Sequence, residues 1–153
     1  MAVLNRFRQS GRNCKHVHAG YQYPCVRHPR DEINQILKQH IARDICISAI
    51  AYGELEYGVC KSRYPEQDQE ALQQFLAGIP ILDFDWYAAE HFGDIIADLE
   101  RKGQRIGDRD MLIAAHARSL DYTLITNNTR EFERVDGLDI DDWIHRYSPP
   151  GKC

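Results

Sequence analysis

The sequence predicts one α/β domain in which the strands of a mainly parallel sheet alternate with helices. Short apolar and β-branched runs of strand length occur around residues 45–49, 79–84 and 122–126. Between them lie longer segments whose apolar residues recur with helical spacing. The chain has 153 residues, which is enough for one core but too few for two comfortable domains.

The regular pattern begins at residue 31. Apolar residues at helical spacing predict an amphipathic helix over 31–43, and Ile45 and Ile47 mark the buried strand that follows. Ser48 is placed to cap the next helix, because a serine hydroxyl can accept a hydrogen bond from the first turn. The later predicted elements are that helix over 49–60, a polar connection over 64–69 containing Pro65, a helix over 70–77, a strand over 79–84, a helix over 86–102 ended by Gly103, a helix starting near 108, a strand over 122–126, and residues 141–143 closing the edge of the sheet.

The first thirty residues have a different character. They show neither a helical nor a strand period, and they carry six Lys or Arg residues and no acid. Such a basic arm is typical of a nucleic-acid-binding tail or of a transit peptide. Taken by itself the segment is expected to be poorly ordered. We therefore divide the chain into an atypical segment 1–30, a domain 31–147 and a tail 148–153.

Composition excludes several classes of protein. The chain is 43% hydrophobic and has a formal net charge of −4, which is ordinary for a globular protein. No apolar run approaches the roughly 20 residues of a membrane-spanning helix, so no membrane span is predicted. The five cysteines are irregularly spaced, without a CxxC pair, and we expect reduced thiols in the cytoplasm.

Three segments place acids in apolar surroundings, namely those of Glu54, Asp110 and Glu131. Burying a carboxylate is costly unless a positive or hydrogen-bonding group meets it, and Mg²⁺ takes oxygen ligands of this kind. Other interpretations stay open at this point: Glu54 could be a solvated helix residue, and either Asp108 or Asp110 could cap its helix. His116 is expected to be packed in its helix rather than to bind zinc, because no zinc-ligand spacing is present.

Three stretches together resemble the VapC toxins of type II toxin–antitoxin pairs, which are PIN-domain ribonucleases. They are CISAIAYGELEYGV from Cys46 to Val59, IGDRDMLIAAHA from Ile106 to Ala117, and LITNNTREFERVDGLDIDDW from Leu124 to Trp143. The resemblance covers residues 33–143, with the motifs in the family's order and spacing. It implies a PIN-like three-layer sandwich, endonucleolytic cleavage of RNA with Mg²⁺ or Mn²⁺, and neutralisation by a cognate VapB-like antitoxin. We also expect a homodimer.

The resemblance also implies roles for individual residues. Glu54, Asp110 and Glu131 match the acids that bind the metal and carry the catalysis in the family. Asn128 matches a polar position of the third motif, with Thr126 beside it, and both are expected to contact substrate.

The chain departs from the family at its start. The family opens with a strand ending in Leu-Asp-Thr-Asn, and no such motif occurs here. Residues 18–24 can be encoded by codons that read Met-Leu-Asp-Thr-Asn-Ile one base later. We therefore hypothesise that residues 1–30 are a shifted-frame reading of a VapC start, which sequencing the gene across this segment tests.

A first strand that is missing or degraded has consequences for activity. The family's leading aspartate and a central strand are lost together, so we predict weak or no nuclease activity. Asp31 and Glu32 are poor substitutes for that aspartate, because both lie at a predicted helix start.

Two other functions remain to be weighed against the nuclease. A catalytically inactive PIN module would still bind an antitoxin or a like subunit, and Tyr52, Tyr57 and Tyr64 are candidates for an exposed aromatic interface. A generic α/β phosphate-binding domain is disfavoured, because the sequence contains no glycine-rich phosphate loop.

Overall fold

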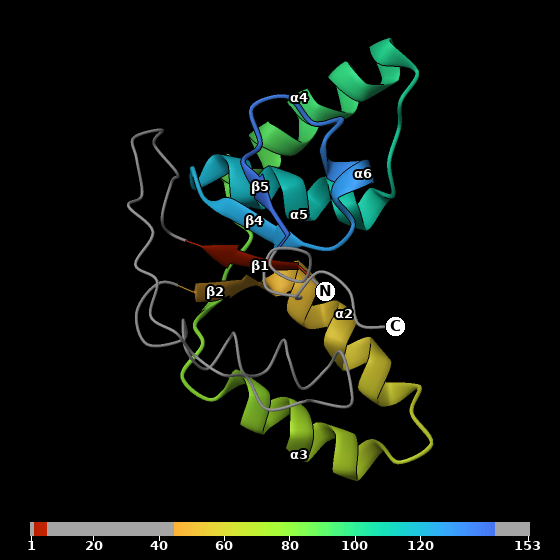
Figure 1. The fold of residues 1–153 in the computed structure, drawn as a ribbon, viewed down its shortest axis with the longest axis vertical. Coiled ribbons are helices and arrows are strands. Elements are labelled where there is room, and N and C mark those ends of the chain that lie inside the picture. Colours follow the sequence, from red (N-terminus) through yellow and green to blue (C-terminus); the bar gives the residue numbers. More distant parts are fainter. Residues whose placement is uncertain (1, 6–44, 143–153) are drawn as a thin grey trace, which may run out of the picture.

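A computed structural model describes residues 2–5 and 45–142 of the chain, and Figure 1 shows their arrangement. The strands are β1 (Ala2–Asn5), β2 (Ile45–Ser48), β3 (Ile81–Leu82), β4 (Thr123–Thr126) and β5 (Ile140–Asp141). The helices are α2 (Ala49–Cys60), α3 (Pro65–Leu76), α4 (Trp86–Lys102), α5 (Asp108–Ser119) and α6 (Thr129–Phe132). The strands form one sheet in the order β3-β2-β1-β4-β5.

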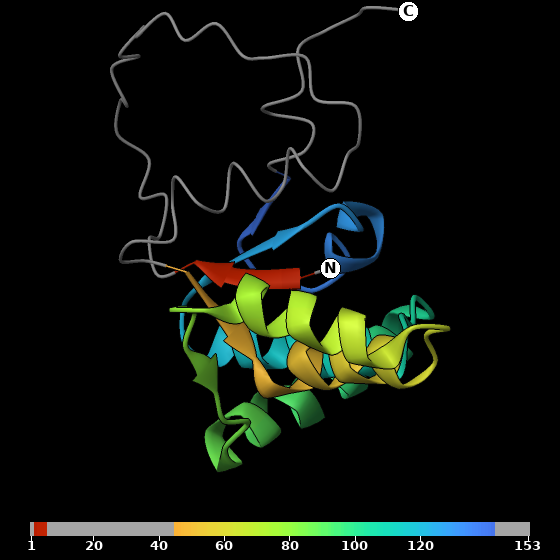
Figure 2. The same ribbon diagram turned by 90° about the horizontal axis from the view of Figure 1, so that it is seen from below.

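β1 is the central strand of this sheet and runs opposite to its neighbours. It pairs antiparallel with β2 and with β4, so that Ala2 lies opposite Thr126 and Asn5 opposite Thr123. The pairs β2–β3 and β4–β5 are parallel. All strands except β1 therefore run in the same direction, and in this sense the sheet is mainly parallel, as predicted. In Figures 1 and 2 β1 lies between the half of the molecule formed by β2, α2 and α3 and the half formed by β4 to β5.

The central position of β1 differs from what the sequence led us to expect. No regular element is predicted within residues 1–30, yet a short strand of reversed direction occupies the place of the first strand. Four residues are too few to show a period, and pairing with β2 and β4 decides their conformation. As a result the amino end of β1, rather than its carboxyl end, lies beside the carboxyl end of β4. The other residues of 1–30, the predicted helix 31–43 and the residues after 142 lie outside the described part.

Helices α2 and α4 have the predicted bounds because each has clear local boundary signals. Ser48 accepts a hydrogen bond from the Ile50 N–H (3.2 Å) at the start of α2. Gly103 ends α4 in the left-handed conformation, with φ of 63°, which costs a glycine little.

Two other predicted boundaries were wrong, and one short helix was not predicted. α3 begins at Pro65 rather than at residue 70, because proline is well suited to the first helical position, where no N–H partner is needed. β3 contains only Ile81 and Leu82 of the predicted strand 79–84. The polar residues after β4 include the short helix α6, which no sequence pattern indicated.

α5 is the helix at the centre of the core. Its buried residues are Met111, Ile113, Ala114, Ala115, His116 and Ala117. The small alanine side chains allow close packing, and the apolar face of α4 contributes Ala88, Ile95 and Leu99 to the buried set. From β1, the side chain of Leu4 is completely buried in this core.

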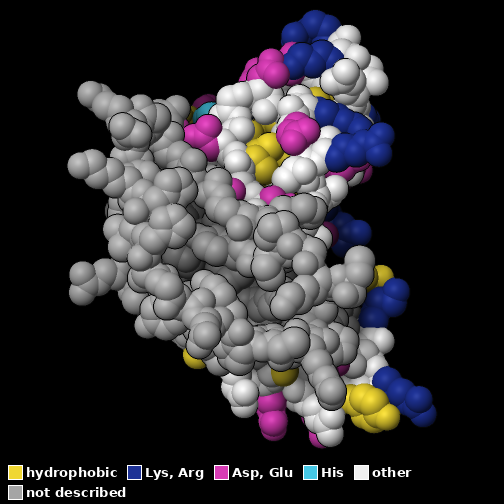
Figure 3. All heavy atoms as spheres, viewed as in Figure 1, with side chains coloured by type: hydrophobic (Ala, Val, Ile, Leu, Met, Phe, Trp, Pro, Cys, Tyr) yellow, Lys and Arg dark blue, Asp and Glu magenta, His cyan; other side chains and the backbone are white. Residues whose placement is uncertain are grey.

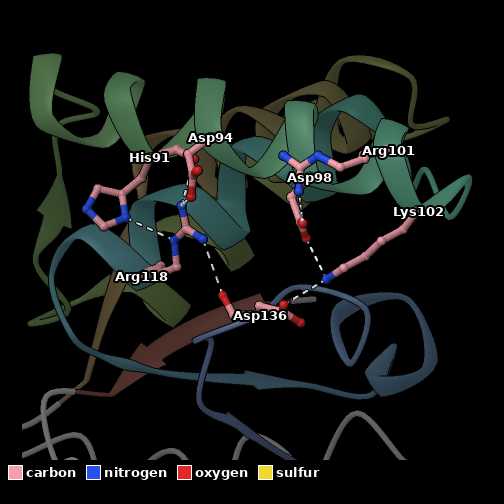
Figure 4. A network of polar contacts seen from close by, with 7 residues as sticks. All are labelled: His91, Asp94, Asp98, Arg101, Lys102, Arg118 and Asp136. Carbon is pink, nitrogen blue, oxygen red and sulfur yellow. Dashed lines mark hydrogen bonds and ion pairs between the residues drawn. The ribbon is translucent and has the colours of Figure 1, made fainter.

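A polar network fixes α4 and α5 to the loop after α6 (Figure 4). Arg118 of α5 donates to His91 Nδ1 (3.0 Å) and to the His91 carbonyl (3.1 Å), and it pairs with Asp94 at 2.6 Å. It also donates to the Asp136 carbonyl at 3.3 Å. The Asp136 side chain is bound in turn by Lys102 at 2.8 Å.

Two features bear on the surface of the molecule. Tyr57 and Tyr64 are exposed, as predicted, but Tyr52 is only partly exposed and donates its hydroxyl to Glu56. Within the described residues, no helix combines the length and the apolar character that crossing a bilayer requires.

Candidate metal centre

Asp110 lies within electrostatic range of two acids that other elements carry. Asp110 lies in the first turn of α5, Glu54 on α2 and Glu131 on α6. Burial raises the pKa of the Asp110 carboxyl, and the negative charges of Glu54 and Glu131 raise it further. Arg109 lowers it in part. Asp110 therefore lies within electrostatic range of both Glu54 and Glu131.

The start of α5 determines how Asp110 is presented. The residue that caps the helix is Gly107, so the expectation that Asp108 or Asp110 is the cap was wrong. Asp108 lies in the first turn instead, is 79% exposed and pairs with Arg105 at 3.1 Å. A Cβ atom added at Gly107 would lie 3.2 Å from Asp110 Oδ2. The glycine therefore leaves room for the Asp110 carboxylate to fold back over the helix start.

Each of the two glutamates is held by an arginine. Arg109 Nε lies 3.4 Å from Glu54 Oε1, and Arg134 Nη1 lies 3.3 Å from Glu131 Oε2. Glu54 is thus neither fully solvated nor buried, with 39% of its side chain exposed. Sequence analysis missed both arginines. The first pair joins two helices that are far apart in the chain, and no local pattern indicates such a contact.

The two residues expected to contact substrate lie at the end of β4. Thr126 is buried, and its Oγ1 accepts a hydrogen bond from the Asn128 N–H at 3.1 Å. This bond turns the chain from β4 into α6. Asn128 is exposed, and its side chain does not cap α6.

The helices that carry Glu54 and Asp110 are joined inside the core. Ser48 caps α2, and its Oγ lies 2.8 Å from Nδ1 of His116 on α5. His116 is buried, as predicted, and its ring also contacts the edge of Phe84. The relative positions of the two acids therefore depend on a buried contact between α5 and the start of α2.

Asp110, Glu54 and Glu131 carry carboxylate oxygens, the type of ligand that Mg²⁺ prefers. Within the described residues, no three His, Cys, Asp or Glu side chains converge closely enough to hold one metal ion. Mg²⁺ nevertheless needs only one or two direct carboxylates, because it keeps several of its waters. β1 adds no acid to the cluster, since its sequence is Ala-Val-Leu-Asn.

Comparison with known families identifies the kind of domain. A sequence profile described as "PIN domain" matches residues 26–138. The chain belongs to the PIN-domain family. This PIN domain is 48% identical over 99 residues to the tRNA(fMet)-specific endonuclease VapC of Shigella flexneri, and the match covers 65% of this chain and 75% of that protein. It is 46% identical over 103 residues to Ribonuclease VapC2 of Haemophilus influenzae, covering 67% and 78% of the two chains.

A solved structure supports the same assignment. The PIN domain is similar to a chain in the crystal structure of VapBC2 from Rickettsia felis bound to a DNA fragment from its promoter. The TM-score is 0.70 at 39% identity, over 74% of this chain and 86% of that one. The resemblance to VapC toxins that three motifs indicated is thereby confirmed.

Proposed function

We propose that this PIN domain is an endoribonuclease toxin that acts with Mg²⁺ or Mn²⁺ and is neutralised by a VapB-like antitoxin. The observation that carries the proposal is the position of Asp110, whose pKa is raised by burial and further by the charges of Glu54 and Glu131 from two other elements. Acids that repel one another at a site favour a cation between them. The ribonuclease names of the VapC relatives support RNA as the substrate.

In this proposal some residues bind the metal ion and others position the RNA. Asp110 is the main metal-binding carboxylate, and Glu54 and Glu131 hold the ion directly or through water. When bound, the ion supplies an activated water and offsets charge on the phosphoryl oxygens. The exposed amide of Asn128 is available to position the RNA, with the Thr126 hydroxyl behind it.

We further propose that the activity of this chain is impaired. The resemblance to VapC implies a leading aspartate at the carboxyl end of a parallel first strand. Here β1 runs in the opposite direction and contains no acid. A site built from the three remaining carboxylates binds the metal less tightly.

Metal-dependent cleavage of RNA by the purified full chain tests the proposal. We expect slow cleavage that requires Mg²⁺ or Mn²⁺, stops with a chelator and is lost in Asp110→Ala. Cleavage that persists at full rate in Asp110→Ala, or in the presence of chelator, would overturn it. Replacing the start of the chain by the shifted-frame sequence, which contains the aspartate, should raise both metal affinity and rate.

A second candidate function is that of an inactive module that binds an antitoxin or another copy of the chain. The exposed rings of Tyr57 and Tyr64, at 54% and 57%, favour it because apolar rings are common in interfaces. Calorimetric titration with Mn²⁺ separates the two. Heat from binding supports the nuclease, whereas copurification with a small partner without metal binding supports the module.

A further inference from the structure

The arginines beside the acid cluster are held only loosely. The pair between Arg109 and Glu54 joins side chains that are 64% and 39% exposed. The pair between Arg134 and Glu131 joins side chains that are 30% and 32% exposed. Water and salt screen such pairs, and they contribute little to stability. They are therefore easily exchanged for other partners.

A divalent cation held by Glu54 and Glu131 would compete with Arg109 and Arg134 for these carboxylates. Once Glu54 and Glu131 turn toward a cation, the two guanidinium groups keep their charges but lose their acidic partners. An arginine cannot lose its proton near neutral pH, so it needs another anion. The anion that a nuclease brings to this place is the RNA backbone.

We propose that Arg109 and Arg134 bind RNA phosphates next to the metal centre, exchanging their glutamates for phosphates when metal and RNA are bound. The inference rests on the proposed function. A guanidinium group suits this exchange because its N–H groups match the oxygens of a carboxylate or a phosphate equally well. Arg134 is partly fixed by its contact with the Arg105 carbonyl at 3.4 Å, whereas Arg109 is the more exposed of the two.

The face shown in Figure 3 carries separate basic side chains rather than one continuous basic patch. In Figure 3 Lys and Arg side chains occur at intervals along the right-hand edge of the face shown. Acids lie among them, so the surface as a whole is not strongly basic. RNA would therefore depend on individual arginines and on the bound cation rather than on a general positive potential.

The substitution Arg109→Gln tests the proposal, because it should weaken RNA binding without weakening metal binding. Glu54 is released from its competitor, so calorimetry should show Mg²⁺ binding unchanged to about fivefold tighter. Anisotropy of a short labelled single-stranded RNA, measured with Mg²⁺ and checked by gel for intact RNA, should show weaker binding. The slope of log affinity against log salt should fall by about 0.7, the value for one phosphate contact.

Arg101→Gln is the matched control. Arg101 is 72% exposed and pairs with Asp98 at 3.1 Å, so the change also breaks one exposed ion pair, but on an acid outside the cluster. RNA affinity and salt slope should stay as in the unsubstituted protein.

The outcomes separate this inference from the nuclease proposal. An Arg109→Gln protein with unchanged RNA affinity and salt slope, or with metal and RNA binding weakened together, overturns the inference. A protein that shows the expected salt slope for Arg109 but never cleaves RNA supports the phosphate contact and counts against the nuclease.

Discussion

Ser48 and His116 are 68 positions apart in the sequence, and in the core the Ser48 Oγ lies 2.8 Å from His116 Nδ1. The His116 ring also donates to the Asp83 carbonyl, so in the neutral ring the remaining nitrogen, Nδ1, accepts from the Ser48 hydroxyl, whose oxygen in turn accepts from the Ile50 N–H. Both side chains are almost fully buried. One hydroxyl group thus caps α2 and connects it to α5, the two helices that carry Glu54 and Asp110.

Ser48→Ala should destabilise the protein by about 2–4 kcal/mol. The change removes a helix cap, which costs about 1 kcal/mol, and leaves a buried ring nitrogen unpaired, which costs about 1–3 kcal/mol. Denaturant unfolding measures the loss. Ser119→Ala is the control, because that hydroxyl is partly exposed and donates only to the His116 carbonyl; a loss as large as for Ser48 would contradict the special position of the buried pair.

Stability should fall as the pH is lowered below about 6.5. Burial lowers the pKa of the His116 ring from 6.5, and the Asp83 carbonyl and the charges of Asp83 and Asp85 oppose this only in part. The unfolded chain therefore takes up a proton at higher pH than the native one, so stability is full above 6.5 and is lost below it. Unfolding at about pH 7.5 and about pH 5 should show a smaller change for His116→Gln than for the unsubstituted protein. Equal changes in the two proteins would exclude His116 as the cause.

Asp110→Asn should raise the thermal stability of the metal-free protein while removing metal binding. Burial and the charges of Glu54 and Glu131 raise the pKa of Asp110, so its ionised form costs stability near neutral pH. Removing a partly exposed repulsion is expected to raise Tm by about 1–3 °C. Asp108→Asn serves as the control, since Asp108 is exposed and attracted by Arg105. A lower Tm for Asp110→Asn would contradict the repulsion.

Leu4→Ala should be strongly destabilising if β1 is the central strand. Leu4 is fully buried, and removing a buried leucine side chain costs about 2–5 kcal/mol. Ile81→Ala on the edge strand β3 is the matched control, because Ile81 is 42% exposed and should lose less than about 1 kcal/mol. Equal denaturant midpoints for the two variants would contradict the position of β1 in the core.

Arg118→Ala should lower stability by about 1–3 kcal/mol. The Arg118 side chain is only 15% exposed and joins α4, α5 and the loop at Asp136 (Figure 4). Arg101→Ala should cost no more than about 0.5 kcal/mol, because Arg101 is exposed and pairs only within its own helix. Chemical denaturation of both variants measures the difference, and similar midpoints would show that the network contributes nothing.

The acids of the candidate site could be proposed from the sequence because they occur in motifs at recognisable spacing. The Arg109 partner of Glu54 could not, since it meets that acid across two helices, whereas Arg134 follows Glu131 by only three residues and was simply overlooked. The role of Gly107 was likewise hidden, because only the folded helix start shows that the Asp110 carboxylate lies against it.

The sequence by itself determined the α/β class, the bounds of α2 and α4 and the kinship with PIN domains. These depend on residues that are near one another in the chain, where caps, glycines and apolar periods act locally. The tertiary structure alone decided that residues 2–5 form the centre of the sheet and in which direction they run. A strand of four residues has no stability of its own, and its backbone groups find partners only when β2 and β4, distant in the sequence, lie on either side of it.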